Sequence, residues 1–566
     1  MTPFSGQLEP SGGLLGRQSA TLGGFVATTA PSGEPPLLVP EDDVDDDEQA
    51  IAAAAEPAAR VTTKGLRSFA RAIRVGVYAL VTRGTIRTPL SGATTPVSSI
   101  EPMTRTLIKG GTVVTAVDTY AADVAIVDDK IAAIFGPHAA PPGPWDVTID
   151  ATGKYILPGG IDAHTHMDMP FGGTTSSDDF ETGTRAAAYG GTTTIVDFAI
   201  QTKGDPLRKG LDLWHQKAEG KAAIDYGFHM IMTDVNPGTI QEMGQVVSEG
   251  ITSFKMFMAY PGVLYVDDAQ IFRGMQRASE LGALICMHAE NGIAIDVLVE
   301  QAIAKGHTAP IYHALSRPQI MEAEGTHRAI CLAEMAGAPV YMVHLSAERA
   351  LKMVVEARDR GLPTYAETCP QYLFLSQDDL ARPDFEGAKY VCTPALRPAH
   401  MQEDLWRGLK THDLQVVSTD HCPFCQKGQK ELGKDSFAKI PNGMPGVETR
   451  LYLLWDGGVR KNRISMNRFV EITSTAPAKI FGLYPNKGTI AVGADADILV
   501  WDGEKRHTLS EKTLHMRVDY SPYEGQEVVG APTHVLSRGK VVVENGKYVG
   551  KKGDGRFAKR GTFNLM

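Results

Sequence analysis

The chain has 566 residues, of which 43% are hydrophobic and 22% are charged, and its formal net charge is -10. This composition predicts a globular protein with a sizeable core, and the acidic balance argues against a nucleic-acid partner. Six cysteines are too few for a disulfide framework in a chain of this length, and no apolar run reaches the roughly 18 residues of a membrane span, so we expect a cytoplasmic protein with no membrane partner.

Residues 1–102 differ in composition from the rest of the chain. Gly, Pro, Ser, Thr and Ala dominate them, seven acidic residues lie within 41–48, and seven Lys or Arg without any acid lie within 60–87. Such a segment has too little apolar surface to form its own core. We expect a disordered N-terminal extension. Translated sequence upstream of a true start at Met103 and a regulatory or targeting element are the alternatives.

A small β domain is predicted from two separate segments. Short strand patterns separated by Gly and Asp-Asp turns occupy residues 103–157, and similar patterns return in residues 484–550. We expect these ends to pair into one β-sandwich domain, with a barrel of residues 158–483 inserted between them. Residues 551–566 are assigned to a C-terminal tail.

The central segment contains eight apolar runs that are rich in β-branched residues, and helical patterns separate several of them. Strands and helices in alternation, with near-continuous apolar strands, indicate a parallel sheet covered by helices. Eight units fit an α/β fold of the closed (β/α)8 type, whose active site lies at the carboxyl ends of the strands. The runs are YILPGGID, TTTIVDFAI, IDYGFHMIM, TSFKMFM, ALICMH, PVYMVHL, PTYAETC and LQVVSTD.

Five candidate metal ligands lie at or near these strand ends. His164 and His166 are two residues apart, so in an extended segment both imidazoles point the same way. His288 and His344 each follow an apolar run, and Asp420 follows the last run with a carboxylate that binds a metal ion or accepts a proton. Each residue alone has a structural explanation, such as a helix cap or turn for Asp420. Together they predict a metal centre at the barrel mouth.

Lys255 is a sixth candidate, because it lies among Phe254, Met256 and Phe257 in a run that would bury it. A buried cation is costly, and a buried lysine tends to be neutral. A neutral amine reacts with carbon dioxide to form an anionic carbamate, whose two oxygens are enough to bridge two ions. A lysine that extends out of the strand end is the alternative.

At these residues the chain resembles the cyclic amidohydrolases of the dihydropyrimidinase and D-hydantoinase group, over about residues 104–550. The resemblance rests on LPGGIDAHTHMDMPFGG, FKMFMAY, HAENG, VHLS, ETCPQYL, STDHCPF, IPNGMPGVETR and GADADILVWD, which occur in the family's order. It implies a homotetramer and two divalent ions, most simply Zn²⁺, with Mn²⁺ or Co²⁺ as alternatives. The implied ligands are His164, His166 and Asp420 for one ion, His288 and His344 for the other, and N6-carboxylated Lys255 as the bridge.

The resemblance also implies substrate contacts and a mechanism. Tyr260 would donate to the carbonyl oxygen under attack, while Thr393, in place of the family's usual serine, and Asn442 would hold the ring largely through main-chain groups. A metal-bridging hydroxide would attack the amide carbon, and Asp420 would act as general base and then as general acid. The small-molecule substrates would be dihydropyrimidines or hydantoins, opened to N-carbamoyl amino acids.

Several other functions compete with this one. An allantoinase-type ureide hydrolase is the nearest, whereas a dihydroorotase would have an arginine where Met167 to Met169 follow the histidine pair. Non-catalytic scaffold relatives of the collapsin-response type have lost metal ligands, but here all six positions are filled. Cys422 and Cys425 form a Cys-x-x-Cys without a second pair, so we expect ordinary thiols.

Overall fold

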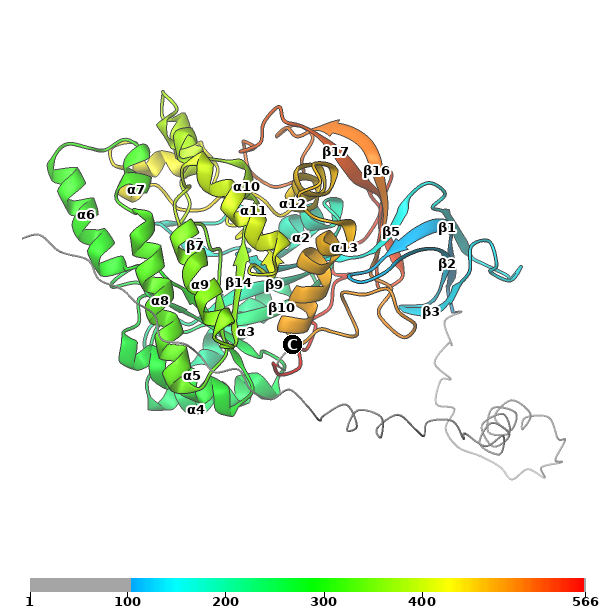
Figure 1. Cartoon of the computed structure of the whole chain (residues 1–566), viewed down its shortest axis with the longest axis horizontal. Coiled ribbons are helices and arrows are strands. Elements are labelled where there is room, and N and C mark those ends of the chain that lie inside the picture. The colour runs from blue at the N-terminus through cyan, green and yellow to red at the C-terminus, as the bar shows by residue number, and fades with distance from the viewer. Residues whose placement is uncertain (1–102, 564–566) are drawn as a thin grey trace, which may run out of the picture. The chain divides into compact units, whose positions relative to one another are not determined.

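The structure is a computed structural model that describes residues 103–563. The extension predicted for residues 1–102 therefore lies outside the described residues. Within the described part, eight strands form one parallel sheet and nine strands form a second, separate sheet. Figure 1 shows the two sheets in different parts of the molecule.

The eight-stranded sheet is a nearly closed barrel whose strands follow one another in chain order. All its neighbouring strands are parallel. A parallel bridge between Thr165 and His421 brings the first strand beside the segment that follows the last one. The strands are β6 (Gly160–Thr165), β9 (Thr192–Ile200), β10 (Asp225–Ile231), β11 (Ser253–Phe257), β12 (Leu284–His288), β13 (Val340–Met342), β14 (Thr364–Thr368) and β15 (Val416–Val417).

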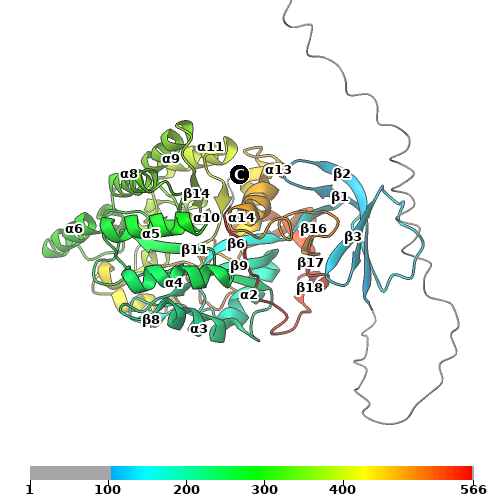
Figure 2. The same cartoon turned by 90° about the horizontal axis from the view of Figure 1, so that it is seen from below.

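Helices cover the outside of the barrel, and Figure 2 shows α3, α4 and α5 along one side of it. Local sequence explains where they begin: the side chains of Asp179 and Asp267 accept backbone hydrogen bonds at the starts of α2 and α5. None of the described helices combines the length and hydropathy that crossing a bilayer requires. The helices are α2 (Phe180–Tyr189), α3 (Leu207–Ala218), α4 (Pro237–Ser248), α5 (Asp268–Glu280), α6 (Gly292–Ala304), α7 (Ile311–Leu315), α8 (Gln319–Ala336), α9 (Glu348–Asp359), α10 (Pro370–Phe374), α11 (Gln402–Lys410), α12 (Arg450–Leu454), α13 (Met466–Val470) and α14 (Ala476–Ile480).

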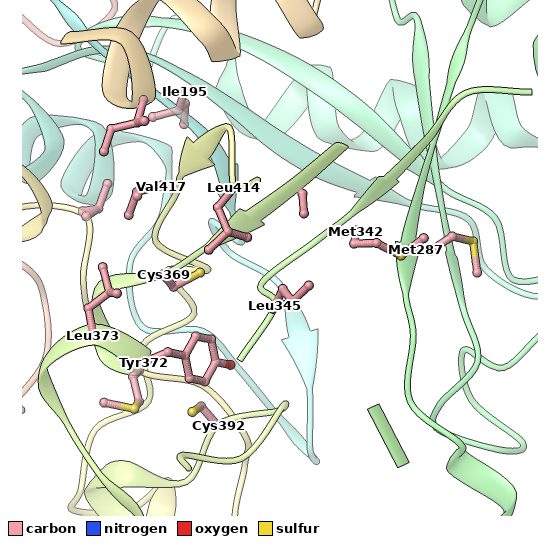
Figure 3. Packing of buried hydrophobic residues seen from close by; sticks show 14 of the residues in the cluster. Ile195, Met287, Met342, Leu345, Cys369, Tyr372, Leu373, Cys392, Leu414 and Val417 are labelled. Carbon is pink, nitrogen blue, oxygen red and sulfur yellow. The ribbon is translucent and has the colours of Figure 1, made fainter. Parts of the chain in front are cut away.

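The main apolar core includes side chains of the barrel strands together with those of the surrounding helices. Met287 of β12 and Met342 of β13 are register partners and lie side by side in Figure 3, and both are buried. Burial of one such side chain stabilises the fold by about 1.5–3 kcal/mol. The strands are apolar on both faces because the barrel interior and the helix layer both exclude water.

The nine-stranded sheet combines strands from both ends of the described chain. β5 pairs antiparallel with β16, which joins the N-terminal strands to the C-terminal ones. The predicted architecture, a (β/α)8 barrel with a small β domain built from segments on both sides of it, is thereby confirmed. Its strands are β1 (Arg105–Val114), β2 (Thr119–Val127), β3 (Lys130–Phe135), β4 (Val147–Asp150), β5 (Tyr155–Pro158), β16 (Ile498–Thr508), β17 (Glu527–Ser537), β18 (Lys540–Glu544) and β19 (Lys547–Tyr548).

The run YILPGGID, predicted as the first barrel strand, is divided between the two sheets. β5 ends at Pro158, and β6 begins at Gly160. Between them, a Cβ added to Gly159 would lie 2.1 Å from Oγ1 of Thr193, so no larger residue fits there without a shift. The barrel strand therefore begins later than the apolar run and carries His164 near its end.

A buried ion-pair cluster joins the nine-stranded sheet to the barrel. Lys487 Nζ lies 2.7 Å from carboxylate oxygens of Asp225 and Asp497 and 3.0 Å from one of Asp495. Burial alone would lower the pKa of Lys487, but the three carboxylates raise it. These aspartates have the spacing of a cation site, and the lysine ammonium lies among them, so the cluster is explained as an ion-pair network.

Candidate active site

The predicted ligands converge at the carboxyl ends of the barrel strands. Three of them lie within strands: His164 in β6, Lys255 in β11 and His288 at the end of β12. His166, His344 and Asp420 follow β6, β13 and β15 closely. Each of these side chains belongs to a residue that is at most 9% exposed. The barrel topology is what allows residues far apart in sequence to share one buried site.

His164, His166 and Asp420 form the tightest group. Asp420 Oδ1 lies 3.2 Å from Nε2 of His164 and 3.1 Å from Nε2 of His166. Ligand atoms of the three residues all lie within 4.8 Å of one another, which is a spacing that a single cation bridges. Nζ of Lys255 lies 3.0 Å from the same Nε2 of His164, so the lysine adjoins this group.

His288 and His344 form a second pair, with ring centres 4.6 Å apart. The His344 ring lies 5.3 Å from that of His164, which joins the two groups. Nε2 of His288 lies 3.0 Å from a carboxylate oxygen of Glu290, so its Nδ1 is left for another partner. Nδ1 of His166 and of His344 are buried without a hydrogen-bond partner, a situation that calls for a bound group.

Burial favours the neutral forms of three of the histidines and of Lys255. It lowers the pKa of His164, His166 and His344, so the unprotonated imidazoles that bind metal ions prevail at neutral pH. Burial also lowers the pKa of Lys255, although nearby carboxylates oppose this shift. The side chains that meet here are imidazoles, one amine and one carboxyl group, a donor set that suits a divalent cation of the first transition row.

Lys255 lies inside the barrel and is only 1% exposed, so it does not extend out of the strand end. Its Nζ lies 4.3 Å from the ring centre of Phe198 and 4.8 Å from that of Phe257. In the strand register it pairs with Ile231 of β10 and Cys286 of β12. Apolar neighbours of this kind explain why burial favours the neutral amine.

Glu367 of β14 is a site residue to which the sequence analysis assigned no role. Its carboxylate hydrogen-bonds Nδ1 of His164, and it accepts hydrogen bonds from the Tyr341 hydroxyl at 2.9 Å and from the backbone N–H of His344 at 3.1 Å. Burial raises its pKa, and the hydrogen bonds from Tyr341 and from the backbone of His344 oppose this shift. A carboxylate behind a ligand histidine fixes the orientation and tautomer of the ring. The signal in the sequence was an acid within an apolar strand run, the same kind of signal that singled out Lys255.

Two adjoining cavities give access to these groups. The inner cavity has a volume of about 40 Å³, and the outer one has about 720 Å³. The inner volume is enough for ions and water, since one water needs about 10–15 Å³, whereas the outer volume suits a small organic molecule. The inner cavity is lined by His166, Lys255, His288, His344 and Asp420, together with Tyr260, Thr393 and Asn442.

The predicted substrate residues lie on one wall of the inner cavity. Burial raises the pKa of Tyr260, and the polar side chains of Thr393 and Asn442 only partly oppose this shift, so its phenol stays protonated. Tyr260, His344 and Asp420 have φ values of 61°, 39° and 52°. Backbone strain of this kind is concentrated at functional sites.

The cysteine pair lies outside the groups of residues 103–563 that have the spacing of metal ligands. Cys422 and Cys425 are free thiols, and neither belongs to a cluster with the spacing of metal ligands. Cys422 is buried on the wall of the inner cavity, where burial raises its pKa and keeps the thiol protonated.

Comparison with known proteins assigns the chain to a family. The model of the amidohydrolase family matches residues 155–542. The chain belongs to the amidohydrolase family. The D-hydantoinase of Streptomyces coelicolor is 61% identical over 464 residues, which are 82% of this chain and 99% of that relative.

Solved structures agree with the assignment of this amidohydrolase. The dihydropyrimidinase from Brevibacillus agri is 54% identical, with a TM-score of 0.80 over 81% of this chain and 99% of that one. The L-hydantoinase (dihydropyrimidinase) from Arthrobacter aurescens is 31% identical, with a TM-score of 0.73 over 80% of this chain and 99% of that one. The resemblance inferred from the motifs is thus confirmed, and the amidohydrolase is an enzyme with residues suited to a divalent metal at its barrel mouth.

Proposed function

We propose that this amidohydrolase opens the rings of hydantoins and dihydropyrimidines by hydrolysis and releases N-carbamoyl amino acids. One observation carries the proposal: four histidines, a buried lysine and an aspartate converge beside a cavity whose wall also holds a protonated tyrosine. The D-hydantoinases that are 50–61% identical to the chain support the same substrate class.

We further propose that the site holds two divalent ions, with Zn²⁺ as the first choice and Mn²⁺ or Co²⁺ as alternatives. When bound, such ions lower the pKa of water and polarise the substrate carbonyl. The neutral Lys255 amine would add to carbon dioxide, forming an N–C bond and releasing a proton, and its carbamate would offer one oxygen to each ion. The ligands would be His164, His166 and Asp420 for one ion, His288 and His344 for the other, and the Lys255 carbamate for both.

The side chains of the site supply proton transfer and charge stabilisation. Asp420 accepts a proton from the attacking water and passes it to the ring nitrogen as the C–N bond breaks. The Tyr260 phenol donates a hydrogen bond to the carbonyl oxygen as negative charge develops there. Thr393 and Asn442, on the same wall, hold the ring through main-chain groups. Water thus adds its oxygen to the amide carbon, and the ring nitrogen leaves with the proton.

The outer cavity favours hydantoins with apolar substituents over allantoin. Phe171, Val263, Leu264 and Ile440 are among its lining residues, and they offer contact area to an apolar or aromatic group. The ureido substituent of allantoin would lose hydrogen bonds to water where it meets these residues, and would regain them only beside polar lining residues such as Gln201 and Arg317. An allantoinase activity is therefore the second choice.

A substrate panel tests the proposed function. The purified chain is incubated with Zn²⁺ or Mn²⁺ and with dihydrouracil, hydantoin, phenylhydantoin, allantoin or dihydroorotate, and bound metal is counted by elemental analysis. We expect opening of the hydantoin and dihydropyrimidine rings, with about two ions per chain. Faster opening of allantoin than of the hydantoin and dihydropyrimidine rings would instead indicate an allantoinase. The absence of both metal and ring opening would refute a hydrolase.

We also propose that the chain acts as a cytoplasmic homotetramer. The proposal rests on the resemblance to the cyclic amidohydrolases. Light scattering of the purified protein tests it, because a tetramer has four times the 60.9 kDa mass of one chain. A mass of one or two chains at working concentration would contradict the tetramer.

A further inference from the structure

Lys430 is a buried lysine that the proposed mechanism does not use. It is the first residue of the short 3-10 helix η4 (Lys430–Gly433), in the segment between Asp420 and Asn442. The residue is fully buried, and it lines neither the inner nor the outer cavity. A buried lysine outside the reaction centre requires a structural or positioning explanation.

The ammonium of Lys430 donates to three backbone carbonyls. Its Nζ lies 2.9 Å from the oxygen of Val391, 2.7 Å from that of Pro441 and 2.8 Å from that of Gly443. Burial lowers the pKa of Lys430 to about 7, but three acceptors match the three N–H donors of an ammonium and favour the charged form. The three carbonyls belong to two segments about 50 residues apart in sequence, so the lysine acts as a link between them.

These two segments are the ones that carry the substrate residues. Val391 precedes Thr393 by two positions, while Pro441 and Gly443 are the immediate neighbours of Asn442. The segments are also joined by the N–H of Gly443, which donates to the Val391 oxygen at 3.0 Å. Without the ammonium, that bond would remain, but each of the three carbonyls would lose a donor.

The backbone around Gly443 is packed too closely to readjust without consequences. Gly443 has a φ of 150°, and a Cβ there would lie 2.2 Å from the backbone oxygen of Cys422. Cys422 and Gly443 both line the inner cavity. A shift of the Gly443 carbonyl toward a new donor would therefore change the shape of the cavity wall itself.

We propose that Lys430 is a positioning residue that holds the ring-binding backbone at Thr393 and Asn442 and thereby sets the affinity for the cyclic substrate. The inference rests on the proposed function. Buried carbonyls that lose a donor move toward other partners, and a displacement of about 1 Å near a reacting group costs up to about 100-fold in efficiency. Main-chain contacts bind the ring in the ground state as well as in the transition state. Their loss therefore raises KM more than it lowers kcat.

The test compares Lys430→Met with Lys487→Met. Methionine retains an unbranched apolar chain but has no ammonium. Lys487 is the control because it is also a buried lysine with three oxygen partners. These partners lie in the cluster with Asp225 and line neither cavity. For K430M we expect a rise in KM of about tenfold or more, kcat within about threefold and unchanged bound metal. K487M should lower the thermal midpoint while KM stays at the wild-type value.

Glutamine variants at both positions accompany the methionine variants, in case K430M does not fold. The amide of K430Q has two N–H groups and so serves at most two of the three carbonyls, which still predicts a raised KM. A folded K430M or K430Q with wild-type KM would overturn the proposal. So would an equal rise of KM in the Lys487 variant, because the effect would then follow from lost stability alone.

Hydrogen exchange provides a measurement that does not depend on activity. The amide of Gly443, bonded to the Val391 oxygen, should exchange faster in K430M than in the wild-type protein and should be unchanged in K487M. Unaltered exchange at Gly443 in folded K430M would contradict the positioning role. If the wild-type chain opens no cyclic amide, the proposed function fails, and the exchange of Gly443 still decides whether Lys430 holds the two segments together.

Discussion

Tyr260→Phe removes one hydroxyl group from the wall of the inner cavity and retains the aromatic ring. Thr393 and Asn442 line the same cavity, and burial raises the pKa of the hydroxyl, so it is available as a donor at neutral pH. The ring packs against Phe171 and His288, with centres 5.3 and 5.6 Å away, and phenylalanine preserves these contacts. The substitution therefore isolates the contribution of the hydroxyl.

The expected effect is a large loss of kcat with little change in KM. Removal of one donor to a developing oxyanion lowers kcat by about 100- to 1000-fold, or about 2.7–4 kcal/mol. We expect the lower end for Tyr260, about 100-fold, because the polar side chains of Thr393 and Asn442 interact with its hydroxyl and compete with the substrate oxygen for it. KM changes little because the charge on the oxygen develops only in the transition state.

The assay measures steady-state ring opening of hydantoin, with bound metal determined in the same samples. Tyr265→Phe is the matched control, because Tyr265 lies in the same loop but lines neither cavity, and it should retain wild-type kcat. Wild-type kcat in Tyr260→Phe would refute the oxyanion role. Loss of bound metal in Tyr260→Phe would show that the hydroxyl also supports metal binding, and would refute a role limited to the substrate.

Three further predictions concern the metal centre and the N-terminal segment. Lys255→Ala should lose bound metal and activity, and added short carboxylic acids with Zn²⁺ should restore part of both. Full activity of this variant without the added acids would contradict a lysine bridge. Glu367→Gln should weaken metal binding by about 10- to 100-fold, because His164 loses the carboxylate that orients it. Competition with a chelator measures the metal affinity. An unchanged affinity would exclude this role of Glu367. Deletion of residues 1–102 should leave kcat/KM unchanged, and a large loss would assign that segment to the site or the assembly.

The local pattern of the chain predicted the fold and the candidate metal ligands, whereas Tyr260, Thr393 and Asn442 were chosen from the resemblance to the family. Apolar runs alternating with helical patterns report which surfaces are buried, and a parallel barrel collects the carboxyl ends of its strands at one mouth. That geometric rule is why His288 and His344, at the ends of two apolar runs, were expected beside His164. A charged residue inside an apolar run is informative for the same reason. The run predicts a buried strand, and Lys255 lies within that strand.

Tertiary structure alone decided which atoms meet. Glu367 contacts His164 across 203 positions of sequence, and no pattern near either residue specifies that contact. Lys430 lies in a loop without periodicity, and its acceptors are carbonyls, which every residue has, so only the folded backbone identifies them. The chain by itself determined the barrel and the kinds of side chain at its mouth, because burial follows local hydrophobic pattern. Strand register and loop packing, which depend on contacts between distant segments, determined how those side chains are oriented and held.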